Sequence, residues 1–360
     1  MGVNLFTDVY EVRQMCFGEQ MKSEAEMDRC RKEVFDSIKN KTIAPLRFLM
    51  FKMTNYCNSD CAYCSHAVSA AGKEVKSELP FEVINNTILQ AKEMGVTAVS
   101  VNGGEPLMHR DILRIVSVCR ENHITPVLMT NGLLLPDYWE KLGEAGVRYV
   151  IISVDSFDKK NYEMQRGASF EKAMEGIAAA VKMKEKYGTS IHVTSVLTSE
   201  NSALLPDMIR KLSDMGIWLQ ISPYHHFNPH QKDELSITSE EEINNLTECL
   251  LEMKEQGYLI ANSRGFIQHF PVFFLEKKRI PDEYECLIGY TNLFIDAYGN
   301  VKPCWASCFD SLGNIREKTL KEMWESEQMA RYREDMLSGR CEGCWYLCTG
   351  EVTMFLKNNL

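Results

Sequence analysis

The stretch MTNYCNSDCAYCSHA, residues 53–67, places three cysteines within eight positions. Cys57 and Cys61 have three residues between them, and Cys61 and Cys64 have two. The loop directly follows an apolar run, RFLMFKMT, that is typical of a buried strand. Thiolates bind zinc or iron–sulfur clusters, and a closed structural zinc site takes four ligands. Because this loop supplies only three, it favours a metal centre that keeps one coordination position open.

Outward from this loop, short apolar runs alternate with longer amphipathic stretches. Six apolar runs are predicted strands, at residues 47–54, 98–104, 126–132, 149–155, 191–198 and 218–223. Glycines fall where the intervening helices should end, at Gly95, Gly146, Gly188 and Gly216. Six β-then-α units predict a parallel sheet with right-handed crossovers, and they are too few for an eight-stranded barrel. We therefore expect an α/β fold, a partial (β/α)6 TIM-like barrel.

The flanking segments have a different texture. Residues 1–45 are predicted to form an N-terminal helical segment and residues 46–262 the barrel, which ends with a helix at 236–257. Residues 263–360 are predicted to form a separate small α+β domain, with a hairpin at 291–304 that turns at Gly-Asn and one helix at 319–339.

The polar motifs gather at strand ends. The three cysteines follow the first strand, GGEP at 103–106 the second and TNG at 130–132 the third. SVD at 153–155 ends the fourth, and HHFNPH at 225–230 follows the sixth. Chemistry in such folds lies at the carboxyl ends of the strands. We therefore expect all of these motifs on one rim of the barrel.

Composition limits the classes of partner and compartment. The net charge of −10 gives no basic footprint for nucleic acid or an anionic membrane. No apolar run approaches the roughly 18 residues of a membrane span, and the first residues lack a secretory pattern. We expect a cytoplasmic protein with reduced thiols. Four of its 13 cysteines stand singly and are expected to be small buried hydrophobes, namely Cys16, Cys30, Cys119 and Cys249.

CNSDCAYC, with the aromatic Tyr63 before its third cysteine, resembles the cysteine signature of the radical S-adenosylmethionine (radical SAM) superfamily, and GGEP resembles its companion motif. The resemblance implies that Cys57, Cys61 and Cys64 bind three irons of a [4Fe–4S] cluster and that S-adenosyl-L-methionine chelates the fourth. It implies reductive cleavage of that cofactor to a 5′-deoxyadenosyl radical, which abstracts hydrogen from an unactivated C–H bond. A flavodoxin- or ferredoxin-type protein would donate the electron.

The resemblance also suggests cofactor-binding residues. The backbone of Gly103, Gly104 and Pro106, together with Glu105, would take the methionine amino group. Ser153 and Asp155 would contact the ribose or carboxylate. Arg166 would pair with the methionine carboxylate, and Tyr63 would lie near the adenine. Each of these residues also has an interpretation without a cofactor. GGEP could form only a tight turn, Ser153 and Asp155 could cap a helix, and Arg166 could be a solvated surface charge.

A second group of cysteines lies near the C-terminus. Cys286, Cys304 and the CEGC pair, Cys341 and Cys344, resemble the SPASM extension or its shortened form, twitch. The resemblance implies that these four bind one auxiliary [4Fe–4S] cluster, and a zinc ribbon is the alternative. Cys308 and Cys348 have no place in this set of four. Either could replace one of the assumed ligands, donate a hydrogen atom to a substrate radical, or be a structural thiol.

Three functions remain open from the sequence. The first is oxidative modification of a ribosomally synthesised peptide, since an auxiliary cluster can accept an electron from the product radical. The second is a dehydrogenase or epimerase of a small sugar or aminocyclitol in natural-product biosynthesis. The third is a zinc-binding scaffold without activity. The histidines of YHHFNPH, at 224–230, are a further candidate for contact with a peptide or small polar substrate.

Overall fold

The computed structural model describes residues 23–64, 75–225, 233–277, 285–305, 309–341 and 344–357. Of the residues singled out above, Cys16, His226, His230 and Cys308 lie outside these ranges.

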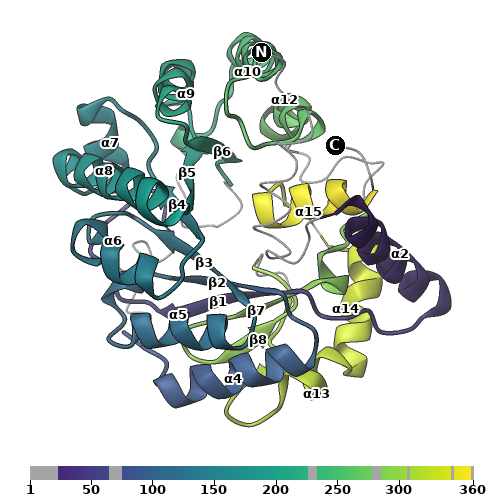
Figure 1. Ribbon diagram of the computed structural model, residues 1–360. Coiled ribbons are helices and arrows are strands. Elements are labelled where there is room, and N and C mark those ends of the chain that lie inside the picture. The colour runs from purple at the N-terminus through teal and green to yellow at the C-terminus, as the bar shows by residue number, and fades with distance from the viewer. Residues whose placement is uncertain are drawn as a thin grey trace.

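A curved nine-stranded sheet organises the chain, in the order β6-β5-β4-β3-β2-β1-β7-β8-β9 (Figure 1). Six strands are mutually parallel and lie where the apolar runs predict them: β1 (Phe48–Thr54), β2 (Ala98–Gly103), β3 (Thr125–Thr130), β4 (Tyr149–Ser153), β5 (Ser190–Leu197) and β6 (Trp218–Pro223). The sheet is open, since β6 and β9 are its two edges. This confirms the partial barrel.

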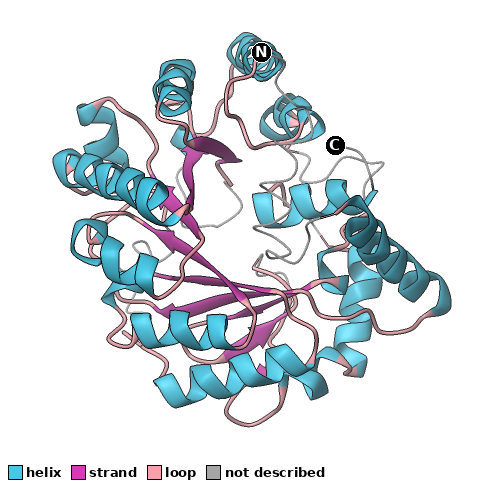
Figure 2. Cartoon of the chain, in the orientation of Figure 1, coloured by secondary structure: helices cyan, strands magenta, loops and turns pink. Residues whose placement is uncertain are grey.

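Helices follow the strands and cover the outer face of the sheet (Figure 2). The helices of the barrel are α4 (Phe81–Glu93), α5 (Ile112–Glu121), α6 (Leu135–Glu144), α7 (Lys159–Arg166), α8 (Phe170–Tyr187), α9 (Leu205–Asp214) and α10 (Glu240–Glu255). Short 3-10 turns stand at η1 (Pro106–Met108), η2 (Ser202–Leu204) and η3 (Asp233–Leu235). The strands are buried on both faces, since neighbouring residues that point to opposite faces are both buried: Phe51 and Lys52 are 0% and 5% exposed, and Val99 and Ser100 are 0% and 1% exposed. No helix in the described ranges is both long and apolar enough to cross a membrane.

The C-terminal hairpin continues the barrel sheet instead of standing apart from it. β7 (Asn292–Ile295) pairs in parallel with β1, from Phe48 opposite Asn292 to Phe51 opposite Ile295. β8 (Asn300–Lys302) and β9 (Gly313–Asn314) add antiparallel strands. The predicted turn is present, with Gly299 at φ +88°. The sequence did not predict this pairing, because local patterns do not show which edge of a sheet a strand will join.

The rest of the C-terminal part is helical: α11 (Arg264–Gln268), α12 (Phe270–Leu275), η4 (Ile288–Tyr290), α13 (Leu320–Trp324), α14 (Glu327–Leu337) and α15 (Leu347–Lys357). The single helix predicted at 319–339 is wrong. It divides because the Ser326 hydroxyl accepts a hydrogen bond from Met329 N and starts a new helix. α15 lies at the open side of the curved sheet (Figure 1).

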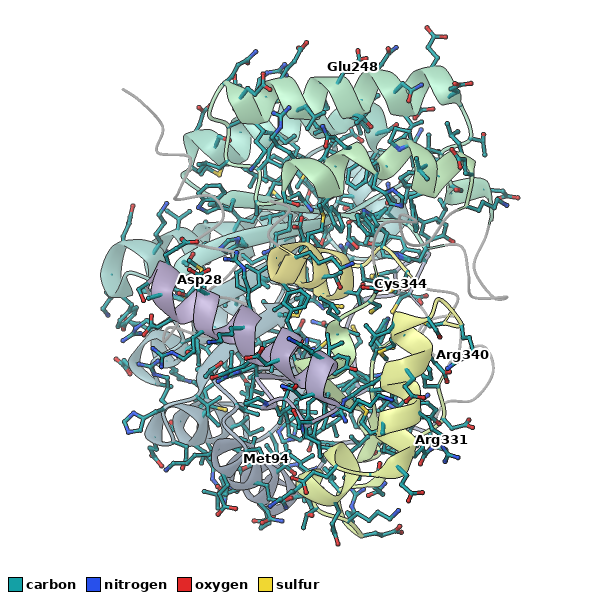
Figure 3. The ribbon with its side chains drawn as sticks, turned by 90° about the vertical axis from the view of Figure 1, so that its right-hand side faces the viewer. Asp28, Met94, Glu248, Arg331, Arg340 and Cys344 are labelled. Atoms are coloured by element: carbon teal, nitrogen blue, oxygen red, sulfur yellow. The ribbon has the colours of Figure 1, made fainter. Side chains whose placement is uncertain are left out.

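The N-terminal segment packs on this C-terminal part. α2 (Glu24–Asn40) begins with a capping box at Ser23 and Glu26. It lies beside α14 and α15 (Figure 3), where Arg31 Nε donates to Phe355 O at 3.0 Å. Trp324 Nε1 donates to Ala44 O at 2.9 Å. The first and last helices of the described chain, α2 and α15, therefore pack against each other.

Candidate functional site

The three-cysteine loop leaves the carboxyl end of β1 and is fastened to α7. Cys64 N donates to Cys61 O at 3.1 Å, and Ala62 N donates to Gln165 O at 2.9 Å. Gly167, which ends α7, approaches so closely that an added Cβ would lie 2.4 Å from Asp60 O. The helix therefore supports the loop from one side.

The thiols of this loop are half-buried, and none of the eleven described cysteines forms a disulfide. Burial raises the pKa of Cys57, and it raises the pKa of Cys61 to about 11 although Arg166 opposes the shift. The negative charges of Cys57 and Cys64, which belong to the same loop, contribute to the raised pKa of Cys61. Thiols bind iron as thiolates, so loading this site must release protons.

The GGEP motif brings the end of β2 against the end of β1. An added Cβ on Gly103 would lie 2.3 Å from Thr54 O, and one on Gly104 would lie 2.3 Å from Tyr56 O. Gly104 N donates to Thr54 O at 2.8 Å, and the next residue's N donates to Tyr56 O at 2.7 Å. Glycine is required here by close approach of two backbones, and buried Pro106 then begins η1.

Glu105 is 0% exposed and links the ends of β2 and β3. Its carboxylate accepts from Leu107 N at 3.0 Å, Thr130 Oγ1 at 2.8 Å and Asn131 N at 2.7 Å. Burial raises its pKa to about 7, while these donors hold it down. The carboxylate thus positions the loop after β3. Its contact with a methionine amino group stays a prediction.

Asn131 was missed as a site residue. Its Nδ2 lies 4.0 Å from Cys57 Sγ and donates to Asn58 Oδ1 at 2.7 Å and to Ser59 Oγ at 3.1 Å. The signal available in the sequence was an amide side chain directly after the third strand, at the same rim as the cysteines.

A buried network stands beside the loop. Asp155, 1% exposed, faces Arg166 with two oxygens, at 2.7 Å from Nη2 and 2.6 Å from Nε. It also accepts from the Tyr63 hydroxyl and from Val196 N at 2.9 Å. Arg166 Nη1 lies 4.0 Å from Cys61 Sγ. The cysteine loop, β4 and α7 are therefore joined through one carboxylate.

This network modifies the roles expected from the resemblance. Burial lowers the pKa of Arg166, but the negative charges of Asp155, Tyr63 and Cys61, together with the hydrogen bond to Asp155, hold the pKa well above its ordinary value. The guanidinium is a fixed cation whose fork is directed at Asp155, with one edge toward Cys61. Ser153 is half-buried and lies opposite Thr194 of β5. Their contacts with S-adenosylmethionine stay predictions.

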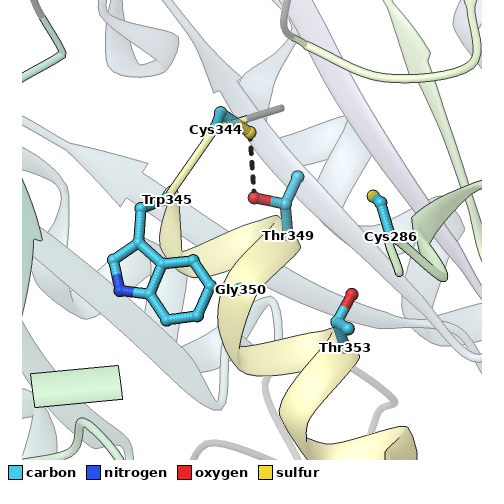
Figure 4. A pocket seen from close by; sticks show the side chains of 6 residues that line it. All are labelled: Cys286, Cys344, Trp345, Thr349, Gly350 and Thr353. Carbon is cyan, nitrogen blue, oxygen red and sulfur yellow. Dashed lines mark hydrogen bonds between the residues drawn. The ribbon is translucent and has the colours of Figure 1, made fainter. Parts of the chain in front are cut away.

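The second cysteine group assembles at the open side of the barrel. Cys286 and Cys304 belong to one buried cluster, against which Cys341 packs. Cys286 and Cys344 line one pocket, together with Trp345, Thr349, Gly350 and Thr353 (Figure 4). Cys348 does not line this pocket and lies in the first turn of α15, where its charge acts on Tyr346. Cys286 thus shares a buried cluster with Cys304 and a pocket with Cys344, and a common set of four ligands stays a prediction.

His225 contacts the residues that follow Cys344. It follows β6, is 4% exposed, and its Nε2 accepts from Trp345 N at 3.0 Å. Its ring stacks on Tyr346 with centroids 3.4 Å apart. This histidine therefore packs against Trp345 and Tyr346, which directly follow Cys344 in the chain.

The residues present fit an iron–sulfur cluster at the first site. Within the part of the chain that is described, no three His, Cys, Asp or Glu side chains surround a single ion position. A [4Fe–4S] cluster does not need such a position, because each thiolate binds a different iron. Three sulfurs of one loop, flanked by an arginine cation and an amide, suit that donor set.

Comparison with known proteins assigns two segments of the chain to known domain families. Residues 51–212 match the radical SAM superfamily, and residues 286–345 match an iron-sulfur cluster-binding domain, SPASM. A probable GTP 3′,8-cyclase of Methanopyrus kandleri is 35% identical over 179 residues, which span 49% of this chain and 56% of that protein.

Two further relatives align over most of their length. The AdoMet-dependent heme synthase of Methanosarcina barkeri is 26% identical over 86% of this chain and 91% of its own. The PqqA peptide cyclase of Gluconobacter oxydans is 24% identical over 84% and 83%. Among solved structures, Streptococcus suis SuiB bound to its precursor peptide SuiA superposes with a TM-score of 0.65 at 20% identity, covering 84% of this chain and 70% of SuiB.

The two matched segments coincide with the two cysteine groups, and their cofactors are S-adenosylmethionine, the [4Fe–4S] cluster that binds it and auxiliary iron–sulfur chemistry. The scaffold without activity is set aside, because relatives of this domain pair are enzymes. The chain therefore belongs to the radical SAM superfamily of enzymes, with a SPASM iron–sulfur domain at its C-terminus.

Proposed function

We propose that this enzyme oxidises a ribosomally synthesised peptide at an unactivated C–H bond. The observation that carries the proposal is the pairing of β7 with β1. β1 ends at the three-cysteine loop, and β7 lies between Cys286 and Cys304 in the chain. The two cysteine groups are thus attached to neighbouring strands of one continuous sheet, and an auxiliary [4Fe–4S] cluster held by the second group can accept the electron of a product radical.

When bound, S-adenosylmethionine and its cluster supply one-electron cleavage and hydrogen-atom abstraction. The chain's own residues hold the loop and its charges. Asp155 fixes the Arg166 cation beside Cys61, where it favours the thiolate. Glu105 and Asn131 fix the loops after β2 and β3 around Cys57. All of these side chains are held by internal contacts, so the site is preorganised.

The peptide substrate is supported by two of the relatives, the PqqA peptide cyclase and SuiB, whose solved complex holds a precursor peptide. The names of the heme synthase and the GTP cyclase favour a small molecule instead, as does the sugar or aminocyclitol alternative. Epimerisation would need a hydrogen donor, and Cys348 is the described candidate, half-buried in α15. We place oxidation first because an auxiliary cluster can accept the electron of the product radical, and we place a peptide first because one relative is a peptide cyclase and SuiB is solved with a precursor peptide.

We further propose that a flavodoxin or ferredoxin supplies the electron and that the enzyme works in the cytoplasm, where reducing conditions keep the cysteines available to iron.

The test is product analysis with the anaerobically reconstituted full chain, S-adenosylmethionine and dithionite. Short peptides encoded beside the gene, aminocyclitols and porphyrinogens are offered in parallel. Of these three classes of substrate, we expect only a peptide to stimulate 5′-deoxyadenosine formation. The modified peptide should be lighter by the mass of two hydrogens. Turnover of a small molecule with no change in any peptide contradicts the substrate. A peptide product of unchanged mass but inverted stereochemistry contradicts oxidation. Cys344→Ala is expected to retain cofactor cleavage but lose the oxidised product.

A further inference from the structure

One hydroxyl faces a cysteine in the pocket that Cys286 and Cys344 line. Thr349 Oγ1 lies 3.1 Å from Cys344 Sγ, and the threonine is 4% exposed (Figure 4). The threonine stands in the first turn of α15, and Cys286 lines the same pocket. The contact is therefore a sulfur hydrogen bond inside a protected cavity.

The protons of this contact can be counted. Thr349 Oγ1 also donates to Tyr346 O at 3.0 Å, and a hydroxyl carries only one hydrogen. In the thiol form, the Cys344 S–H must therefore donate to the hydroxyl oxygen. Once Cys344 is a thiolate, its sulfur carries no hydrogen and can only accept a hydrogen bond. If the Thr349 hydrogen stayed on Tyr346 O, the sulfur would face the hydroxyl oxygen with no hydrogen between the two atoms.

The hydroxyl is able to turn. Tyr346 O accepts two backbone hydrogen bonds in addition, from Thr349 N at 3.0 Å and from Gly350 N at 2.7 Å. The carbonyl therefore stays satisfied when the hydroxyl hydrogen leaves it, and the rotation to sulfur leaves no buried group unpaired.

We propose that Thr349 is a positioning residue for the auxiliary cluster, donating a hydrogen bond to the Cys344 thiolate and thereby raising the cluster's reduction potential. This rests on the proposed function through the assignment of Cys344 as a cluster ligand. A reduced cluster carries more negative charge than an oxidised one, so a donor to its sulfur stabilises the reduced form more.

A purely structural role would give a different result, and a matched control separates the two. Thr247 of α10 is also a buried helical threonine, 7% exposed, whose hydroxyl donates to Ile243 O at 2.7 Å. Thr247→Val removes an equivalent hydroxyl far along the chain from either cysteine group. Thr349→Ser keeps the donor at the site and removes only a methyl group.

The experiment uses the full-length chain with Cys57, Cys61 and Cys64 changed to Ala, so that only the auxiliary cluster remains, and follows its reduced EPR signal in a potentiometric titration. We expect Thr349→Val to lower the ratio of reduced to oxidised cluster at a fixed potential about tenfold, a shift of about 59 mV. Thr349→Ser and Thr247→Val should stay near the parent value. A potential for Thr349→Val equal to the parent overturns the inference.

Two further outcomes keep the test decisive. If Thr349→Val does not assemble a cluster, pulsed EPR in deuterated water compares Thr349→Ser with Thr349→Ala. A coupled exchangeable deuteron that the serine variant keeps and the alanine variant loses supports the bond, and identical spectra overturn it. If Cys344→Ala leaves the iron content unchanged, the ligand assignment within the proposed function fails, whatever the threonine variants do.

Discussion

The ion pair beside the first cluster loop gives the sharpest energetic prediction. Asp155 and Arg166 are 1% and 7% exposed and meet through two contacts, at 2.7 and 2.6 Å. Asp155→Asn leaves a buried cation without its countercharge, and Arg166→Met leaves a buried carboxylate. Breaking one side of such a pair costs about 3–5 kcal/mol, whereas replacing both partners often costs much less.

The double variant should therefore lose less than the two single losses combined, by about 2–3 kcal/mol. The asparagine keeps an oxygen for Val196 N, so the backbone contact survives in every variant. The assay is urea unfolding of the iron-free chain under anaerobic, reducing conditions, followed by tryptophan fluorescence. Iron-free protein is used because cluster binding would itself add stability.

The matched control is Asp207 and Lys211 of α9, which lie 2.7 Å apart but with side chains 63% and 52% exposed. Asp207→Asn and Lys211→Met should show only weak coupling, since solvent screens an exposed pair. Additive losses at Asp155 and Arg166, no larger than in the control cycle, would refute the reasoning that this carboxylate holds the cation by charge.

Two other predictions concern backbone approach and pH. Gly104→Ala places a Cβ 2.3 Å from Tyr56 O, so it should destabilise the chain by about 1–3 kcal/mol and lower the iron retained after reconstitution. Gly188→Ala meets no atom but is strained at φ +66°, so it should cost about 1 kcal/mol with iron content unchanged; equal iron in both variants would contradict the reasoning. Burial raises the pKa of Glu351 from 4.5 to about 7. Between these two pH values the folded state therefore binds more protons than the unfolded state. The free energy of unfolding should fall by about 3 kcal/mol as the pH rises through this range. Glu351→Gln should reduce the fall in the urea midpoint measured from pH 4.5 to 7. Glu252→Gln, at an exposed position, should leave the fall unchanged. An unchanged fall in Glu351→Gln would show that the Glu351 carboxyl does not cause the pH dependence.

The barrel could be read from the sequence because its strands are buried on both faces. β4, for example, is the continuous apolar run YVII with Ser153 at its end, and burial of both faces is what makes such runs visible. The rim could also be foreseen, since parallel strands bring their carboxyl ends together. Cys57 and Glu105 were expected there, and their charges do act on each other in the structure.

Pairings between distant residues could not be foreseen. Nothing local to Arg166 shows that it meets Asp155, because both identities are compatible with cofactor contacts or with each other. The joining of β7 to β1 depends on which sheet edge is left uncovered after folding. Thr349 carries no motif at all, and only its distance to Cys344 reveals it.

The central claim is that three thiolates of one loop hold a cluster on which S-adenosylmethionine is cleaved. It is tested most directly by iron content and 5′-deoxyadenosine formation in the anaerobically reconstituted chain, before and after Cys57, Cys61 and Cys64 are changed to Ala. With one auxiliary cluster, we predict about eight irons per chain, falling to about four in the variant with cofactor cleavage abolished. Unchanged iron with cleavage intact in the variant, or stoichiometric zinc in the parent chain, would contradict the account.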